Sequence, residues 1–256
     1  MQKKFLIPIF CAVIFILDAC HSPRLVINNV SPHNSKNSID WNGVYSGTLP
    51  CTDCEGTPTM IQINKDGSYI IEKLYPGKIQ NITRVAGTYR WNITGNNIIF
   101  DVDKNTTPAY YSIGENKITQ LDLEGNENSG AAAERYILQK QPAIVEKYWK
   151  LIELNGNVVS NAITGPEPHL ILKAIENRAL GNGGCNGFFG TYQIMEGNRI
   201  AFSQMAATKM ACQNLETENQ LFRVFEMADN YTLVNDTLSL NKARMAPLAK
   251  FVAVVK

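Results

Sequence analysis

The chain has 256 residues, six cysteines and a formal net charge of +1. This length allows one large or two modest domains, each with its own core, and we interpret the chain as two. Acidic and basic residues are mixed throughout, without a basic run or an acidic tail. This balance excludes nucleic acid as an expected partner.

Residues 1–19 have the pattern of a signal peptide. Lys3 and Lys4 precede an apolar run from Phe5 to Leu17, which is too short to cross a bilayer as a helix. The sequence that follows, Leu17-Asp18-Ala19-Cys20, resembles the cleavage site of bacterial lipoproteins. The resemblance implies that Cys20 becomes a lipidated N-terminus that holds the chain at a membrane. A plain secretory signal or an uncleaved anchor is the alternative.

Residues 20–40 are rich in Ser, Asn and Pro and lack an apolar period. This composition predicts a flexible tether between the lipid and the folded domains. His21 and Ser22 do not resemble the Asp that retains some lipoproteins in the inner membrane. By that analogy we expect the chain in the outer membrane, facing the periplasm.

From residue 41 to residue 140 apolar and polar residues alternate with the period of two that is typical of strands. Short turns with glycine separate the alternating stretches, and glycine readily adopts the positive φ that such turns need. The expected hairpins pair 58–64 with 68–75, 84–94 with 98–102, and 110–113 with 117–123, and a strand at 136–139 follows. Many short strands joined in this way predict an antiparallel barrel or sandwich.

The same segment carries a distinctive set of positions. They are Trp41-x-Gly43-x-Tyr45-x-Gly47-x-Leu49-Pro50-Cys51-x-Asp53-Cys54-x-Gly56, Asp66, Tyr69, Tyr75, Gly87, Trp91, Ile98, Tyr110-Tyr111, Leu121-Asp122-x-Glu124-Gly125 and Tyr136-x-Leu138. Together they resemble the N-terminal domain of the NlpE copper-resistance lipoproteins. The resemblance implies a small lipocalin-like β-barrel, with a role in copper resistance or in the envelope stress response.

A linker at 141–147, which contains Pro142, leads to a second domain at 148–256. Its motifs are Trp149-x-Leu151, Asn155-Gly156, Gly181-x-x-Gly184-Cys185-Asn186-x-x-x-Gly190-x-Tyr192 and Thr208-x-Met210-Ala211-Cys212. These resemble the META (HslJ-like) domain, which implies a β-rich α+β fold with one main helix. The glycine run lacks the Lys-Ser/Thr of a phosphate-binding loop, so we interpret it as structural.

The main helix is expected between Cys212 and Asn230. Leu221, Phe222, Phe225 and Ala228 fall on one face, and residues 217–220 have the pattern of a capping box. A hairpin of 231–234 with 237–240 and a closing strand at 250–255 should complete the domain.

Four cysteines remain for the mature chain after Cys11 leaves with the signal and Cys20 takes lipid. An even number in an oxidising envelope suggests disulfides. Three pairings are possible, and the large sequence gap between the two groups favours Cys51–Cys54 and Cys185–Cys212.

Little in the sequence predicts catalysis, and we interpret the chain as a non-enzyme. His169, the single histidine of the folded domains, follows Pro168 in an expected strand, and we interpret it as structural. Three interpretations of Cys51-x-x-Cys54 compete, namely a disulfide, a copper(I) site and a thioredoxin-like redox centre. Pro50 and Gly56 leave no room for the helix that a redox centre uses to lower a thiol pKa. Once reduced, the pair could bind copper(I), with Met60 as a possible third ligand.

The resulting hypothesis is a non-enzymatic lipoprotein of the cell envelope, concerned with copper resistance or envelope stress and working with an envelope protein partner. One alternative is a barrel that binds a small apolar ligand. The other is a protein-interaction module that acts through the META surface.

Overall fold

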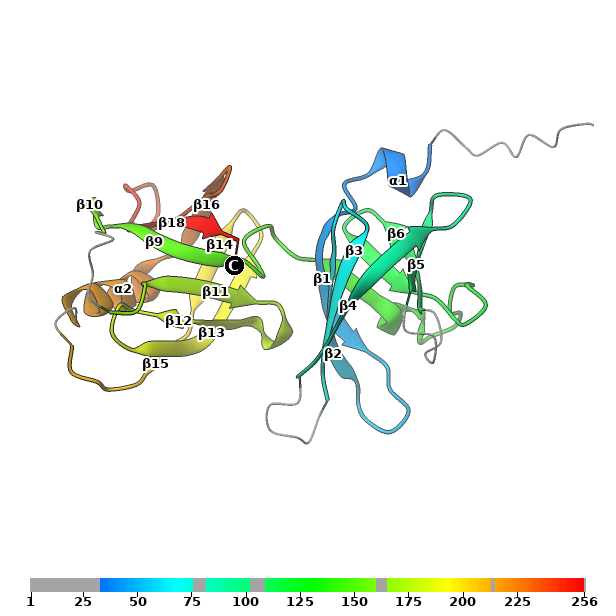
Figure 1. The fold of residues 1–256 in the computed structure, drawn as a ribbon, viewed down its shortest axis with the longest axis horizontal. Coiled ribbons are helices and arrows are strands. Elements are labelled where there is room, and N and C mark those ends of the chain that lie inside the picture. Colours follow the sequence, from blue (N-terminus) through cyan, green and yellow to red (C-terminus); the bar gives the residue numbers. More distant parts are fainter. Residues whose placement is uncertain (1–32, 76–81, 102–108, 160–164, 213–214, 256) are drawn as a thin grey trace, which may run out of the picture. The chain divides into compact units, whose positions relative to one another are not determined.

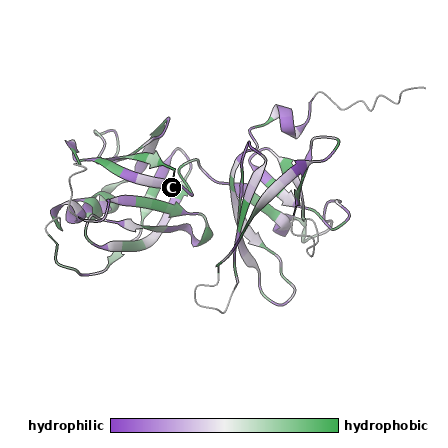
Figure 2. Cartoon of the chain, in the orientation of Figure 1, coloured by the Kyte–Doolittle hydropathy of each residue, from purple (hydrophilic) through white to green (hydrophobic). Residues whose placement is uncertain are grey.

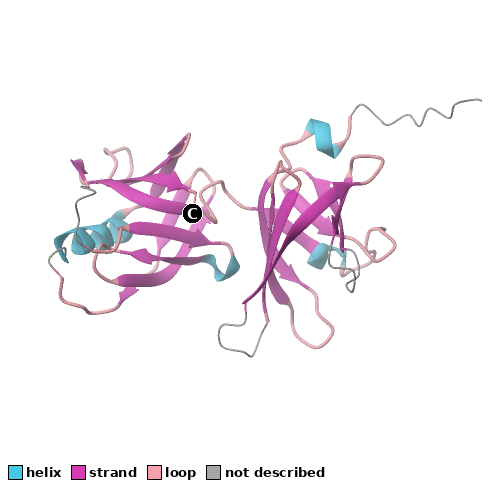
Figure 3. Ribbon diagram, viewed as in Figure 1, coloured by secondary structure: helices cyan, strands magenta, loops and turns pink. Residues whose placement is uncertain are grey.

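The computed structural model describes residues 33–75, 82–101, 109–159, 165–212 and 215–255, so the expected signal peptide and Cys20 lie outside it. Strands dominate both halves of the described chain, and α2 (Leu215–Met227) is its one long helix (Figures 1 and 3). The mainly β fold, with an N-terminal antiparallel barrel and one main helix, is therefore confirmed. Within the described residues, no helix combines the length and the apolar character that a membrane span requires.

The first domain is a closed barrel in which each strand pairs with its neighbours in sequence and β1 pairs with β8. The strands are β1 (Gly43–Leu49), β2 (Thr57–Ile63), β3 (Ser68–Leu74), β4 (Ile82–Trp91), β5 (Asn97–Asp101), β6 (Ala109–Gly114), β7 (Lys117–Gln120) and β8 (Ile137–Lys140), with the 3₁₀ turn η1 (Ala133–Tyr136) before β8. The turn glycines Gly67 and Gly95 have φ of 89° and 72°, the left-handed region that these tight turns require.

Aromatic and aliphatic side chains on alternate strand positions form the core of the barrel. The ring centroids of Tyr69 and Phe100 lie 4.2 Å apart, and those of Phe100 and Tyr111 lie 5.2 Å apart. Tyr45, Ile61 and the other residues of this cluster are buried. The period of two in the sequence thus places one side of each strand in this core.

The second domain is a sheet in which β18 pairs back with β9, so that its ring of strands also closes. Its elements are β9 (Tyr148–Leu154), β10 (Asn157–Val158), β11 (His169–Lys173), η2 (Ile175–Asn177), β12 (Arg178–Asn182), β13 (Gly187–Met195), β14 (Arg199–Phe202), β15 (Ala206–Ala207), α2, β16 (Asn230–Val234), β17 (Thr237–Asn241) and β18 (Ala249–Val254). Hydrophobic and hydrophilic residues follow one another along strands such as β9 and β11 (Figure 2).

Helix α2 packs into the core of this sheet. Leu221, Val224 and Phe225 are at most 1% exposed and belong to one cluster with Trp149 and Phe251. Phe225 also contacts the rings of Phe188 and Phe202. The apolar face expected from the sequence is therefore the buried face of the helix.

Two local expectations were wrong. Residues 35–38 of the expected tether form the short helix α1 (Ser35–Ser38), which the Asn34 side chain caps and the β4–β5 turn holds, since Lys36 N donates to Gly95 O at 3.0 Å. The capping box at 217–220 is also absent, because the helix already begins at Leu215. Thr217 therefore lies inside the first turn instead of capping it. The Gln220 side chain, which a capping box would direct to the Thr217 backbone N–H, donates to Glu216 Oε1 at 2.7 Å.

Candidate functional site

Cys51 and Cys54 form a disulfide in the loop between β1 and β2, with their Cα atoms 5.5 Å apart. The Cys54 Sγ lies 3.8 Å from Thr57 Oγ1, and Thr52 Oγ1 donates to Asp53 Oδ1 at 2.6 Å. Arg135, from η1, donates to the Glu55 carbonyl at 3.4 Å. The loop exposes Asp53 and Glu55, so its surface carries two acidic groups beside the bridge.

Met60 is not placed as the third copper ligand that its sequence position suggested. It is 2% exposed and belongs to the core cluster of the second domain, together with Trp149 and Leu172. Because side chains of a strand alternate between faces, Met60 points out of the barrel while its neighbours Ile61 and Thr59 point inward. Copper(I) at the two reduced cysteines would therefore be held by the two sulfurs alone, in linear coordination, or would take a third ligand other than Met60.

The glycine–cysteine motif of the second domain is a structural joint. Cys185 and Cys212 form a disulfide with Cα atoms 5.8 Å apart, which links the segment before β13 to the segment before α2. A Cβ at Gly183 would lie 2.6 Å from the Glu218 side chain, so this glycine allows close packing of the loop on α2.

Asn186 and Glu218 lie at the centre of this joint and are 1% and 4% exposed. The Asn186 backbone N–H donates to Glu218 Oε2 at 2.6 Å, and its amide donates to Oε1 at 2.9 Å. In turn, Asn186 Oδ1 accepts from Thr208 Oγ1 and from the Met210 backbone N–H, both at 2.8 Å. Each buried polar group is thereby satisfied. The Glu218 carboxylate, which α2 places against Gly183 and Asn186, would also repel a phosphate bound at the glycine run.

The two domains meet at a small charged network around Lys173 of β11. Its ammonium lies 3.1 Å from Glu72 of β3 and 2.5 Å from Glu146 of the linker, and both carboxylate side chains are at most 8% exposed. Glu146 also accepts from the Ala174 backbone N–H at 2.7 Å. Burial alone would lower the pKa of Lys173, but the hydrogen bond and charge of Glu146, and then those of Glu72, raise it.

His169 opens β11 and stacks on Tyr148, with ring centroids 4.4 Å apart. Its Nδ1 lies 2.8 Å from the Glu167 carbonyl oxygen, and Tyr148 donates to the Glu167 carboxylate at 2.9 Å. Among the described residues, no three His, Cys, Asp or Glu side chains gather closely enough to hold a metal ion.

The sequence pointed to the cysteines but not to Glu218, Glu72 or Lys173. One signal for Glu218 was present, because this acidic residue lies three residues before Leu221 on the apolar stripe of the helix. No local signal joins Glu72 to Lys173, which are 101 residues apart.

Two known protein families match the chain, one in each half. Residues 45–131 match the family described as the NlpE N-terminal domain, and residues 142–254 match the META domain. The first match covers most of β1, the Cys51–Cys54 loop and β2 to β7, and the second covers the sheet of the second domain and its helix.

Individual proteins are also similar to parts of the chain. The chain is 27% identical over 127 residues to lipoprotein NlpE of Escherichia coli K12, which covers 49% of this chain and 53% of that protein, so the chain spans about half of its length. A putative lipoprotein from Shewanella oneidensis is 40% identical over 42% of this chain and 95% of its own, with a TM-score of 0.39. The structure of the Cpx pathway activator NlpE from E. coli is 16% identical over 65% of this chain and 94% of its own, with a TM-score of 0.29.

Proposed function

Because the chain joins an NlpE N-terminal domain to a META domain, we propose that it is a non-enzymatic lipoprotein of the cell envelope that senses or resists envelope stress, including excess copper. The observation that carries the proposal is the similarity to lipoprotein NlpE, together with the Cys51-x-x-Cys54 loop. The match to the META domain begins at residue 142, two residues after the last barrel strand, β8, ends.

Membrane attachment through Cys20 is the first part of the proposal. In labelled cells, wild-type protein should incorporate fatty acid and fractionate with the outer membrane. The Cys20→Ala variant should enter the soluble periplasmic fraction or accumulate as an unprocessed precursor. Wild type without fatty acid would refute the lipid anchor, and inner-membrane fractionation would refute the outer-membrane location.

Signalling through an envelope protein partner is the second part. One solved relative is described as an activator of the Cpx pathway. We therefore expect expression of the full chain in E. coli that lacks its own lipoprotein NlpE to raise a Cpx-dependent reporter above an empty-vector control. A reporter that stays at the control level would remove the proposed signalling role in that pathway.

Copper binding by the reduced Cys51–Cys54 pair is the third part. The bridge closes a loop of about four residues and contributes roughly 2 kcal/mol in the chain-entropy model, so mild reductant should open it while the domains stay folded. The thiolates would then suit copper(I). Copper titration of the reduced protein should lose one site in the Cys51→Ser/Cys54→Ser variant, and equal uptake by both would leave the bridge purely structural.

The rival roles receive less support. In the barrel core, Phe100 packs ring against ring with Tyr69 and with Tyr111, which does not favour an apolar ligand inside. Crosslinking in cells, with the META domain deleted as the comparison, would detect a partner of that domain.

A further inference from the structure

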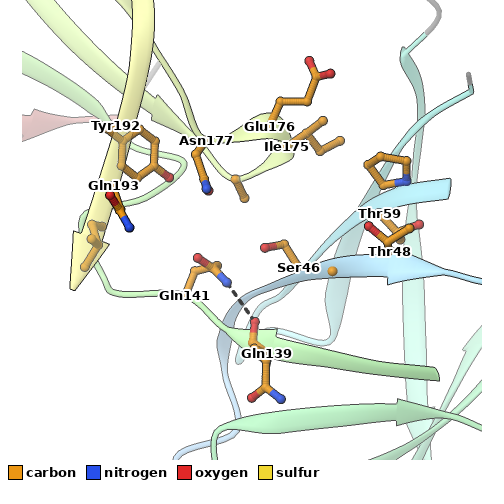
Figure 4. Close-up of a pocket in the computed structure, with 14 residues that line it drawn as sticks. Ser46, Thr48, Thr59, Gln139, Gln141, Ile175, Glu176, Asn177, Tyr192 and Gln193 are labelled. Atoms are coloured by element: carbon orange, nitrogen blue, oxygen red, sulfur yellow. Dashed lines mark hydrogen bonds between the residues drawn. The ribbon is translucent and has the colours of Figure 1, made fainter. Parts of the chain in front are cut away.

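A hollow of about 680 Å³ lies between the outside of the barrel and the second domain. Strands β1, β2 and β8 line it on the barrel side, and η2 with the end of β13 lines it on the other side (Figure 4). Its volume falls within the range of small-molecule sites. Neither family match covers both walls, since the first ends at residue 131 and the second begins at 142.

Hydroxyl and amide side chains dominate the lining. In Figure 4, Ser46, Gln141 and Asn177 extend into the hollow from different elements. Within the described part of the chain, the side chains of Ser46, Thr48, Asn177 and Gln193 have no protein hydrogen-bond partner, and none of them is buried. Several groups that can both donate and accept are therefore available to an occupant.

The charges of the lining exclude other classes of ligand. Glu176 is its one charged residue, and the described lining contains no Lys, Arg or His. A phosphate or carboxylate ligand would meet no cation there and one repelling carboxylate. The apolar part, Pro58, Ile175 and Ile194, is too scattered among polar groups to suit an acyl chain.

The walls of the hollow are held in place before any ligand arrives. Lys173 bridges the domains through Glu72 and Glu146, and Met60 of β2 packs into the second domain's core. At the rim, Glu176 and Asn177 have φ of 57° and 47°, consecutive left-handed residues of a tight hairpin turn. A pre-formed wall reduces the ordering entropy that binding would otherwise cost.

We propose that this interdomain cleft binds an uncharged saccharide. Sugar hydroxyls donate and accept at the same atom, as the amides and hydroxyls of the lining do, and a saccharide needs no cation. Glu176 can accept from a hydroxyl at the rim, and Ile175 and Ile194 can contact the apolar face of a sugar ring.

Calorimetric titration of the full lipidated chain in detergent tests the proposal, with chitotetraose, maltotetraose and cellotetraose as probes. At least one probe should bind, and the Asn177→Ala/Gln193→Ala variant should weaken it about tenfold or more, because two ligand hydrogen bonds are lost. Thr48→Trp should abolish binding from the barrel side by filling the space. The control Gln204→Ala/Asn157→Ala removes exposed amides elsewhere on the second domain and should leave affinity unchanged.

Thermal melting should show that the variants stay folded. Within the described residues, the side chains of Thr48, Asn177 and Gln193 make no hydrogen bond, and Asn157 of the control makes a single long one, to the Asn155 carbonyl at 3.4 Å. Three results would overturn the proposal: no binding of any probe at millimolar concentration, equal affinity of wild type and the cleft variants, or binding of extended peptides in place of sugars.

Discussion

At the scale of single residues, position 181 must be glycine because the backbone of the neighbouring strand leaves no room for a Cβ atom. A Cβ at this position would overlap the His169 carbonyl oxygen on the paired strand β11 and press on the Phe188 ring. Gly187, in the same motif, would meet nothing closer than 3.8 Å. Two glycines that look alike in sequence therefore differ in how much they are needed.

We expect Gly181→Ala to lower the free energy of unfolding of the second domain by about 3 kcal/mol, because the backbone of β11 or β12 must shift. Gly187→Ala should change it by about 0.5 kcal/mol or less. Urea unfolding of the two variants beside wild type checks this. Similar losses in both would mean that the motif's glycines serve something other than local packing.

At the scale of elements, the two disulfides join different lengths of chain. Cys185 and Cys212 are 27 residues apart and tie the start of β13 to the segment before α2, whereas Cys51 and Cys54 are three residues apart in one loop. The Asn186–Glu218 hydrogen bonds hold the same junction as the longer bridge. The longer bridge therefore constrains two elements, and the shorter one constrains a turn.

The Cys185→Ser/Cys212→Ser variant should lose roughly 3.5 kcal/mol of unfolding free energy in the chain-entropy model, and Cys51→Ser/Cys54→Ser roughly 2 kcal/mol. Urea unfolding without reductant measures both. Equal losses, or a larger loss for the shorter bridge, would contradict the expectation. Peptide mapping of the unreduced wild type should show the two bridged peptide pairs.

At the scale of the whole described chain, Lys173 links the second domain to the barrel. Its ammonium lies between two nearly buried carboxylates, one from β3 and one from the linker, while Arg84 reaches Glu72 only at 3.8 Å. Loss of the lysine would leave buried negative charge with little compensation. The ion pairs therefore stabilise the contact between domains as well as each domain's surface.

Lys173→Met should lower the unfolding free energy by about 3 kcal/mol. Breaking a buried ion pair typically costs about 3–5 kcal/mol, and the lower value applies here because the Lys173 side chain is 24% exposed. Lys250→Met, which breaks the more exposed pair with Glu153, should cost about 1 kcal/mol or less. Chemical denaturation measures both, and equal losses would mean that Lys173 does not hold the domains together.

The pH dependence of the Lys173 contribution follows from its raised pKa. A pKa raised on folding means that the ion pairs contribute fully below the ordinary lysine value of about 10.4. Their contribution disappears as the pH rises through the folded-state pKa. The stability difference between wild type and Lys173→Met should therefore be constant near neutral pH and shrink in strongly alkaline solution. A difference that already shrinks near neutral pH would contradict this sign.

Local patterns were sufficient for much of the architecture. The period of two and the short turns predicted hairpins that the structure contains, such as β2–β3 and β16–β17, because a turn and its flanking strands are neighbours in sequence. The apolar stripe of α2 predicted its buried face for the same reason. The cysteine motifs located the residues that form both bridges.

Contacts between distant segments were decided only by the tertiary structure. Met60 looked like a free side chain near the cysteines, yet it is buried against the second domain, because the outward face of β2 is covered there. Glu72 and Lys173 come from segments far apart in the sequence, and so do the two walls of the interdomain cleft. Nothing in the local sequence of one segment indicates that it contacts the other. A sequence pattern reports which face of an element is apolar, whereas the element that covers this face is chosen by packing over the whole chain.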